Sequence, residues 1–288
     1  MTELSPEVVA LLPPVLLFLG LMVGSFLNVV IYRLPIIMES RWRQGCYELL
    51  EIEGENNDTP LSLAFPNSHC PQCNTPIKPW QNIPVISYLI LKGKCASCAT
   101  PIAKRYPILE FVTGIMTMLL GFYFHVPMAL LGVVLFTWAL IALTMIDVDH
   151  QLLPDDITLP LLWMGLLFNV FETYVPLADA VIGAAAGYLI LWSVFWLFKL
   201  VTGKEGMGYG DFKLLAALGA WMGWQTLPLI ILLSSVVGAV LGIFMIVSRG
   251  RSKDTPMPFG PYLAMAGWIT LLWGDTISQY YYSALGVS

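Results

Sequence analysis

Charged residues are scarce in this chain of 288 residues. Only 11% of the residues are Asp, Glu, Lys or Arg, whereas a soluble domain carries roughly 25%. Together with a hydrophobic fraction of 57%, this composition excludes intrinsic disorder and most soluble globular folds. The formal net charge is −5, so the composition gives no sign of nucleic-acid binding. The mean hydropathy of +0.74 predicts an all-α polytopic membrane protein.

A cleavable secretory signal is also lacking. The residues before the first apolar run, Val8 to Tyr32, contain no basic side chain, and no small-residue cleavage site follows. The run is long enough to cross a bilayer. We therefore expect residues 1–34 to form a retained first transmembrane helix that starts near Pro13.

Long uncharged runs continue along the second half of the chain. Phe111 to Ile146 contains no Lys, Arg, Asp or Glu, which is too long for one span of about 20 residues. Proline and polar residues place breaks at His125–Pro127 and at Gln225–Pro228. We predict about eight transmembrane helices: the first within 1–34, then 107–124, 128–146, 157–171, 180–198, two within 214–248, and a last one from Phe259.

A polar insert follows the first span. Residues 35–105 contain all five cysteines and 13 of the charged side chains. The predicted organisation is a first helix (1–34), an insert (35–105) and a seven-helix membrane core (106–288). If the N-terminus lies outside, all 14 basic residues, Arg249, Arg251 and Lys253 included, fall in cytoplasmic segments, as the positive-inside rule requires.

Two acidic motifs lie at the ends of predicted spans, where ionisable groups are usually functional. Asp147 ends the third span and Asp211 begins the sixth. Two spans separate them, so both lie on the same membrane face. Asp149 is about 200° from Asp147 around a helix, so only one of the two can face Asp211, and spacing alone does not choose between them.

Two adjacent carboxyl groups are what aspartic proteolysis requires. They share a proton because two like charges cannot both form cheaply. The ionised group then activates water and the protonated group polarises the scissile carbonyl. The glycines Gly208 and Gly210 before Asp211 let the backbone approach a substrate strand closely.

Three other interpretations of the acidic residues stay open. They could be helix caps or ordinary interfacial charges. They could form an oxygen-rich metal site from Asp147, Asp149, His150 and Asp155. A transporter could use Asp147 and Asp211 as a proton relay.

The insert contains two Cys-x₂-Cys pairs. Their spacing predicts a closed, structural zinc site, because the insert is too short and polar to fold on an apolar core alone. Two disulfides or redox thiols are the alternative, which a reducing cytoplasm disfavours. Cys46 is left as a free thiol, and we expect His69 to be a neighbour rather than a ligand. The predicted ligands are Cys70, Cys73, Cys95 and Cys98.

These motifs together resemble the type IV prepilin peptidases of bacteria, also called leader peptidase/N-methyltransferases. The resemblance covers nearly the whole chain. Besides the four cysteines it rests on these runs: Gly24-Ser-Phe-Leu-Asn-Val29 with Arg33 and Pro35, Lys104-Arg-Tyr-Pro107 with Glu110, Ile146-Asp147 through Leu153-Pro154-Asp155, Gly208-Tyr-Gly-Asp211, and Pro258-Phe-Gly-Pro261.

The resemblance implies two reactions. The first is cleavage of the leader of type IV prepilins and type II secretion pseudopilins after a glycine, with Asp147 and Asp211 as the catalytic pair. The second is methylation of the new N-terminal amine with S-adenosylmethionine. A peptidase of the same core without methyl transfer is the rival enzyme.

The resemblance also implies a location and a second site. It places the chain in the bacterial inner membrane, with both termini periplasmic and with the insert and the aspartates on the cytoplasmic side. No motif locates the methyl-donor site, but the cysteine module and the region of Gly93 are implied contributors. Asn28 and Glu110 either help to shape that site or form interhelical hydrogen bonds.

Overall fold

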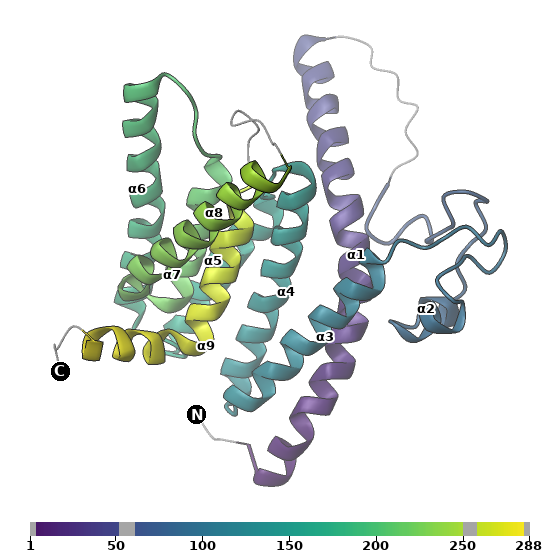
Figure 1. Ribbon diagram of the computed structural model, residues 1–288, viewed down its shortest axis with the longest axis horizontal. Coiled ribbons are helices and arrows are strands. Elements are labelled where there is room, and N and C mark those ends of the chain that lie inside the picture. Colours follow the sequence, from purple (N-terminus) through teal and green to yellow (C-terminus); the bar gives the residue numbers. More distant parts are fainter. Residues whose placement is uncertain (1–3, 52–60, 250–257, 285–288) are drawn as a thin grey trace. The chain divides into compact units, whose positions relative to one another are not determined.

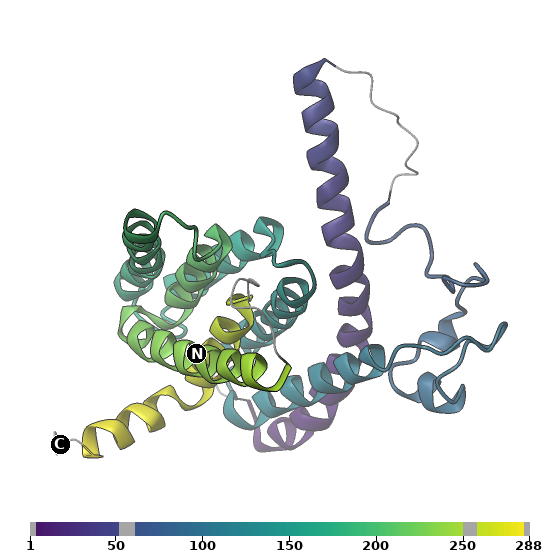
Figure 2. The same cartoon turned by 45° about the horizontal axis from the view of Figure 1, so that its top comes forward.

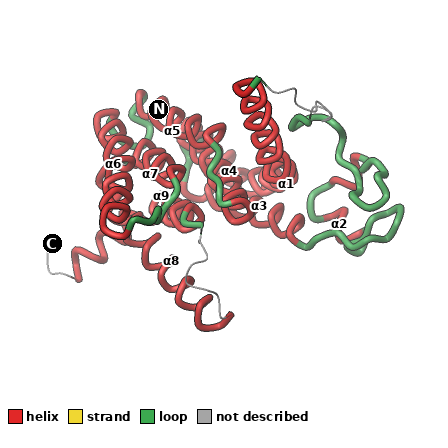
Figure 3. The backbone as a smooth tube through the Cα atoms, turned by 90° about the horizontal axis from the view of Figure 1, so that it is seen from above, coloured by secondary structure: helices red, strands yellow, loops and turns green. Residues whose placement is uncertain are grey.

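The computed structural model describes residues 4–51, 61–249 and 258–284. Within these ranges the chain is helical, with two isolated β-bridges and no β-strand. Figure 3 shows that loop segments gather around the short helix α2 (Ile86–Ile90), while helices form most of the rest. The prediction of an all-α protein is confirmed. Arg251 and Lys253, which support the predicted orientation, lie outside the described residues.

The chain divides into two compact units, 2–125 and 126–288. The first contains α1, α2, α3 and the 3₁₀ helix η1; the second contains α4 to α9 and the 3₁₀ helix η2 (Figure 1). The bounds are α1 Pro6–Leu50, η1 Pro79–Asn82, α3 Arg105–Tyr123, α4 Pro127–His150, α5 Asp155–Val170, α6 Leu177–Thr202, α7 Tyr209–Met222, η2 Trp224–Thr226, α8 Leu227–Arg249 and α9 Gly260–Ala284.

In the described ranges, eight helices of 14 residues or more overlap the eight predicted spans. The predicted breaks lie at the junctions of α3 with α4 and of α7 with α8. Five stretches are long and apolar enough by themselves to cross a membrane, namely α1, α3, α4, α6 and 224–244, which includes α8. The helices α5 and α7 have only 16 and 14 residues. A bilayer core needs about 20 residues of helix. The helices α5 and α7 are therefore too short to span it by themselves and depend on packing against neighbouring helices.

The first helix is longer at both ends than the sequence predicted. It begins at Pro6 rather than near Pro13 and continues through Pro35 to Leu50, so the predicted end at residue 34 lies within it (Figure 2). Loss of hydrophobicity after residue 34 does not end a helix when strong helix formers follow. An i,i+4 ion pair of 2.7 Å between Glu39 and Arg43 supports this continuation.

Small residues allow α1 and α3 to pack closely. A Cβ on Gly20 would lie 2.7 Å from the Thr117 side chain, and one on Gly24 would lie 2.8 Å from the Glu110 α-carbon. Such contacts are the usual means of helix association in a membrane, where apolar surface gains nothing by leaving lipid. Close packing of α1 against α3 therefore stabilises the first unit.

In the second unit, α7 is the buried centre. It packs against α5, α6, α8 and α9, and every residue from Leu214 to Met222 is buried. The backbones of α6 and α7 meet where Gly183 faces Gly219, since a Cβ on either would collide with the other's carbonyl oxygen. The buried Trp221 donates its indole N–H to the Leu161 carbonyl of α5 at 2.8 Å. The apolar packing thus fixes the position of the first turn of α7, which carries Asp211.

Candidate active site

Asp147 lies in the last turn of α4 and is only 5% exposed. Asp149, two residues later, is exposed. The helix therefore turns Asp147 toward the protein interior and Asp149 away from it, a choice that sequence spacing left open.

Asp211 lies in the first turn of α7 and is 7% exposed. Gly208 precedes the helix, and its carbonyl accepts the Asp211 backbone N–H at 3.2 Å. At Gly210 a Cβ would stand 2.7 Å from the Leu153 Cβ. The glycines before Asp211 thus allow close packing, although what packs there in this structure is Leu153.

The structure brings the two aspartates to one place. Asp147 is the neighbouring charge that acts on Asp211. Leu153 joins their surroundings, because it contacts Gly210 beside Asp211 and would lie 3.1 Å from a Cβ on Gly260. The same Cβ on Gly260 would stand 2.6 Å from Asp147 Oδ2.

One oxygen of this pair lacks an ordinary hydrogen bond. Asp147 Oδ2 is buried and has no hydrogen-bond partner of ordinary geometry among the described residues, although the Gly260 backbone N–H interacts with this carboxyl group. Leaving a buried polar atom unpaired costs about 1–3 kcal/mol, and such atoms are rare outside functional sites. The arrangement is a buried carboxyl pair with one acceptor that lacks an ordinary hydrogen bond, which suits proton exchange with a bound molecule.

The other acidic residues of the motif have different surroundings. Asp155 at the start of α5 forms an ion pair with Lys213, whose Nζ is 2.7 Å from both carboxylate oxygens. Within the described ranges, the four cysteines are the one group of metal-binding side chains that converges. The alternative metal site from Asp147, Asp149, His150 and Asp155 is therefore not formed.

The four predicted zinc ligands do converge. The sulfur atoms of Cys70, Cys73, Cys95 and Cys98 all lie within 4.8 Å of one another, and the Cys70 and Cys98 sulfurs are 3.7 Å apart. Zinc–sulfur bonds of about 2.3 Å in a tetrahedron require sulfurs about 3.8 Å apart. The cluster has the size for a metal ion with four thiolates, and it leaves no open coordination position.

Each cysteine pair sits on a turn of the same design. Cys70 N–H donates to the Thr75 carbonyl at 3.0 Å, and Cys95 N–H donates to the Thr100 carbonyl at 2.8 Å. The residues after the second cysteines, Asn74 and Ala99, both have positive φ. The module is therefore built from two equivalent turns that present their sulfurs to each other.

Threonine hydroxyls favour the thiolate forms. Thr75 Oγ1 is 3.3 Å from Cys73 Sγ, and Thr100 Oγ1 is 3.2 Å from Cys98 Sγ. These side-chain hydrogen bonds, followed by backbone hydrogen bonds of the same threonines, lower the pKa of Cys73 and of Cys98. Since metals bind thiolates, these hydrogen bonds favour metal binding by Cys73 and Cys98.

A buried arginine anchors the insert to α1. Arg33 is 7% exposed, and its guanidinium donates to the carbonyls of Ser62, Leu63 and Pro66 at 2.9, 3.4 and 2.7 Å. Five N–H donors in a rigid fork suit several carbonyls at once. The segment before the first cysteine pair is thus held to the helix.

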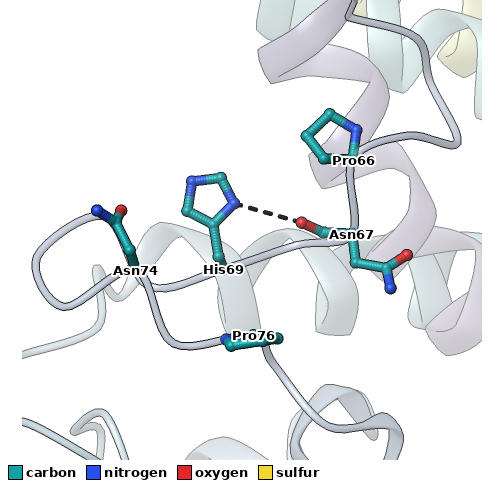
Figure 4. Close-up of a pocket in the computed structure, with 5 residues that line it drawn as sticks. All are labelled: Pro66, Asn67, His69, Asn74 and Pro76. Atoms are coloured by element: carbon teal, nitrogen blue, oxygen red, sulfur yellow. Dashed lines mark hydrogen bonds between the residues drawn. The ribbon is translucent and has the colours of Figure 1, made fainter.

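Neither His69 nor Cys46 belongs to the sulfur cluster. His69 is exposed, lies outside the sulfur cluster, and has its Nδ1 3.3 Å from the Asn67 carbonyl. Figure 4 shows it with Pro66, Asn67, Asn74 and Pro76 around an open depression that has no buried charged lining residue. Cys46 is exposed on α1, away from the cluster.

Several named proteins are similar to this chain over most of its length. A protein from Pseudomonas aeruginosa is 56% identical over 94% of this chain and 93% of its own length. One from Stutzerimonas stutzeri is 57% identical over 92% of both chains, and one from Aeromonas salmonicida is 55% identical over 92% of both. All three are named prepilin leader peptidase/N-methyltransferase. The chain belongs to the type IV leader peptidase family.

Two family models match this chain, one in each half. Residues 18–124 match the Bacterial Peptidase A24 N-terminal domain, and residues 134–243 match the Type IV leader peptidase family. The first match contains the four cysteines and the second contains Asp147 and Asp211, so the two matches follow the two structural units. No solved structure matches the chain.

Sequence reasoning missed two neighbours of the aspartates. Gly260 approaches Asp147, and Leu153 fills the space between Gly210 and Gly260. The Pro-Phe-Gly-Pro run around Gly260 was the available signal, but nothing in the sequence tells which helix end meets which. Asn28 makes an interhelical hydrogen bond, which is one of the two roles expected for it. Its Nδ2 donates to the Tyr106 carbonyl on α3 at 3.4 Å.

Proposed function

We propose that the protein cleaves the leader peptide of type IV prepilins and pseudopilins with Asp147 and Asp211 as an acid–base pair. The observation that carries this proposal is the buried Oδ2 of Asp147, in a carboxyl group whose charge acts on the buried Asp211. The relatives named prepilin leader peptidase supply the substrate class.

The chemistry follows from the sharing of one proton. The ionised carboxylate takes a proton from water, and the resulting hydroxide attacks the scissile carbonyl carbon. The protonated carboxyl gives its proton to the carbonyl oxygen, forming a neutral tetrahedral intermediate. Its collapse breaks the C–N bond: the proton taken from water passes to the leaving amine, and one hydroxyl proton of the intermediate returns to the carboxylate that had protonated the carbonyl oxygen.

The location at helix ends suits a substrate that has a polar leader followed by an apolar helix. Asp147 lies at the end of α4 and Asp211 at the beginning of α7, where water is available, in contrast to the bilayer centre. We place both carboxyls on the cytoplasmic side of the bacterial inner membrane, with both termini periplasmic, because that orientation keeps the basic residues inside.

The second activity is methylation of the newly formed N-terminal amine with S-adenosylmethionine as donor. Its support is the N-methyltransferase part of the relatives' names. We assign it to the first unit, around the cysteine module and Gly93. Gly93 has a φ of +69°, and a Cβ there would lie 2.8 Å from the Tyr88 hydroxyl, so any larger residue would distort this region.

Zinc bound by Cys70, Cys73, Cys95 and Cys98 would stabilise the module without entering the reaction. Four thiolates fill the tetrahedral shell, as in structural zinc sites. The surrounding segments contain short helices and turns only, so metal binding supplies folding free energy that an apolar core does not.

The deciding experiment is a gel-shift assay of prepilin cleavage by the wild type and by Asp147→Asn and Asp211→Asn. Each variant should lose cleavage by about 100-fold or more, since each carboxyl has a proton-transfer role. Unchanged processing in both would reject the peptidase proposal and favour a proton-relay transporter. Labelled S-adenosylmethionine in the same assay separates the two enzyme alternatives, because an unlabelled mature pilin indicates a peptidase alone.

A further inference from the structure

Glu110 is a buried carboxyl group that the peptidase chemistry does not use. It lies on α3 and is 8% exposed. Its Oε2 accepts a hydrogen bond of 2.7 Å from the backbone N–H of Val85, and the Ser25 side chain is its other hydrogen-bonding neighbour. Both neighbours are neutral, so this buried carboxyl is matched to a backbone position rather than to a counter-charge.

The backbone at Val85 is strained. Val85 has φ 60° and ψ −48°, a conformation that a β-branched residue adopts only as an outlier. The Ile86 N–H points back to the Pro84 carbonyl at 2.5 Å, which closes a three-residue γ-turn of the rare, positive-φ kind. Strain of this type persists only where the surrounding structure holds it. The hydrogen bond to Glu110 is a contact that can do so.

The strained turn controls where α2 begins, and α2 leads to Gly93. The Gly93 N–H donates to the Tyr88 carbonyl at 2.9 Å, and the Gly93 carbonyl accepts the Ile102 N–H at 2.8 Å. Residues 85–93 therefore form one short unit. Glu110 fixes its beginning, and the second cysteine turn fixes its end.

We propose that Glu110 is a positioning residue for methyl transfer. Its carboxylate holds the strained turn at Val85 and thereby sets the position of α2 and Gly93. The inference rests on the proposed methyltransferase function and on its assignment to this region. Group transfer is sensitive to such positioning, since a displacement of about 1 Å can lower the rate about 100-fold.

A competing role would be direct charge pairing between Glu110 and the positively charged sulfonium of the methyl donor. The two roles respond differently to substitution. Glu110→Gln keeps an oxygen acceptor for the Val85 N–H but removes the charge, whereas Glu110→Leu removes both. Positioning predicts that Gln is tolerated and Leu is not, and charge pairing predicts that both fail.

The turn itself offers a second test. Glycine adopts positive φ without strain, so Val85→Gly removes the need for the contact with Glu110. The double variant Glu110→Leu/Val85→Gly should therefore recover what Glu110→Leu loses. Glu39→Leu, at an exposed glutamate of α1 that pairs with Arg43, is the matched control.

The experiment uses the full chain in detergent or nanodiscs and measures three quantities: prepilin cleavage, kcat and KM for methylation with labelled S-adenosylmethionine, and hydrogen exchange of residues 86–93. Glu110→Leu should lower the kcat of methylation about 10- to 100-fold and speed exchange about tenfold. Cleavage should stay at the wild-type rate, and Glu110→Gln should resemble the wild type in all three.

Three results would overturn the inference: wild-type methylation by Glu110→Leu, equal impairment by Gln and Leu, or no rescue by Val85→Gly. A wild-type enzyme that leaves mature pilin unlabelled would instead reject the proposed second activity. In that case the hydrogen-exchange rates of residues 86–93 would still test the structural role of Glu110. Unchanged exchange in Glu110→Leu would mean that the carboxylate does not hold the turn at Val85.

Discussion

The Oδ2 atom of Asp147 lies so close to Gly260 that a Cβ on this glycine would be 2.6 Å from it. Gly260 is the first residue of α9, more than a hundred positions along the chain from the aspartate it meets. The space that glycine leaves at this position belongs to the candidate active site.

Substitution of Gly260 by alanine should therefore impair cleavage. The new methyl group would displace the Asp147 carboxyl and press on Leu153, which would lie 3.1 Å from it. We expect prepilin cleavage to fall about 100-fold, as for other small displacements of reacting groups. A gel-shift time course measures this. Gly45→Ala is the control, because no atom lies within 4 Å of its Cβ position; equal activity of the two variants would contradict the prediction.

Zinc retention should depend on pH through the two threonines. Hydrogen bonds with Thr75 and Thr100 lower the pKa of Cys73 and of Cys98, so protons compete less with the metal. A thiol with a lowered folded-state pKa stabilises the fold above its unfolded pKa, and the contribution is lost as pH falls through the lowered value.

Thr100→Val should raise the pKa of Cys98 and move half-release of zinc to higher pH. A chromogenic zinc chelator, read during acid titration of the purified protein, measures the midpoint. Thr202→Val, at a hydroxyl that bonds the Phe198 carbonyl on α6, should leave the midpoint unchanged. A midpoint that shifts equally in both variants would show that zinc release does not depend on the hydrogen bond between Thr100 and Cys98.

Arg33 should be needed to hold the segment before the first cysteine pair. Lysine offers a single ammonium in place of a rigid fork, and it cannot serve all three carbonyls of residues 62–66. We expect limited proteolysis within 62–66 to become about tenfold faster in Arg33→Lys, because local opening exposes the segment. Arg43→Lys changes an exposed arginine, and the rate of limited proteolysis within residues 62–66 should stay as in the wild type.

Gly219→Ala should destabilise the second unit. A Cβ on Gly219 would collide with the Gly183 carbonyl oxygen, and overpacking of this kind costs about 1–3 kcal/mol. Unfolding in a denaturing detergent, followed by circular dichroism, gives the free-energy change. An unfolding curve that coincides with that of Gly45→Ala would show that α6 and α7 can separate without cost.

Much of the architecture could be predicted from hydrophobic runs. The break predicted at His125–Pro127 lies where α3 gives way to α4, and the break predicted at Gln225–Pro228 lies where η2 leads into α8. The predicted end of the first helix, at residue 34, was wrong, because residues 35–50 continue the helix without being apolar. Hydrophobicity reports burial in lipid, whereas helix formation depends on backbone hydrogen bonds and propensity.

The sequence alone determined the class of protein: scarce charge predicted a membrane fold, two Cys-x₂-Cys pairs predicted a sulfur cluster, and the parity of spans predicted that Asp147 and Asp211 share one membrane face. Only the tertiary structure decided that Asp147 rather than Asp149 turns inward, that Gly260 closes on it, and that Glu110 holds a strained Val85. The reason is that spacing fixes the angle of a side chain around its own helix. The partner it meets depends on how separate helices pack.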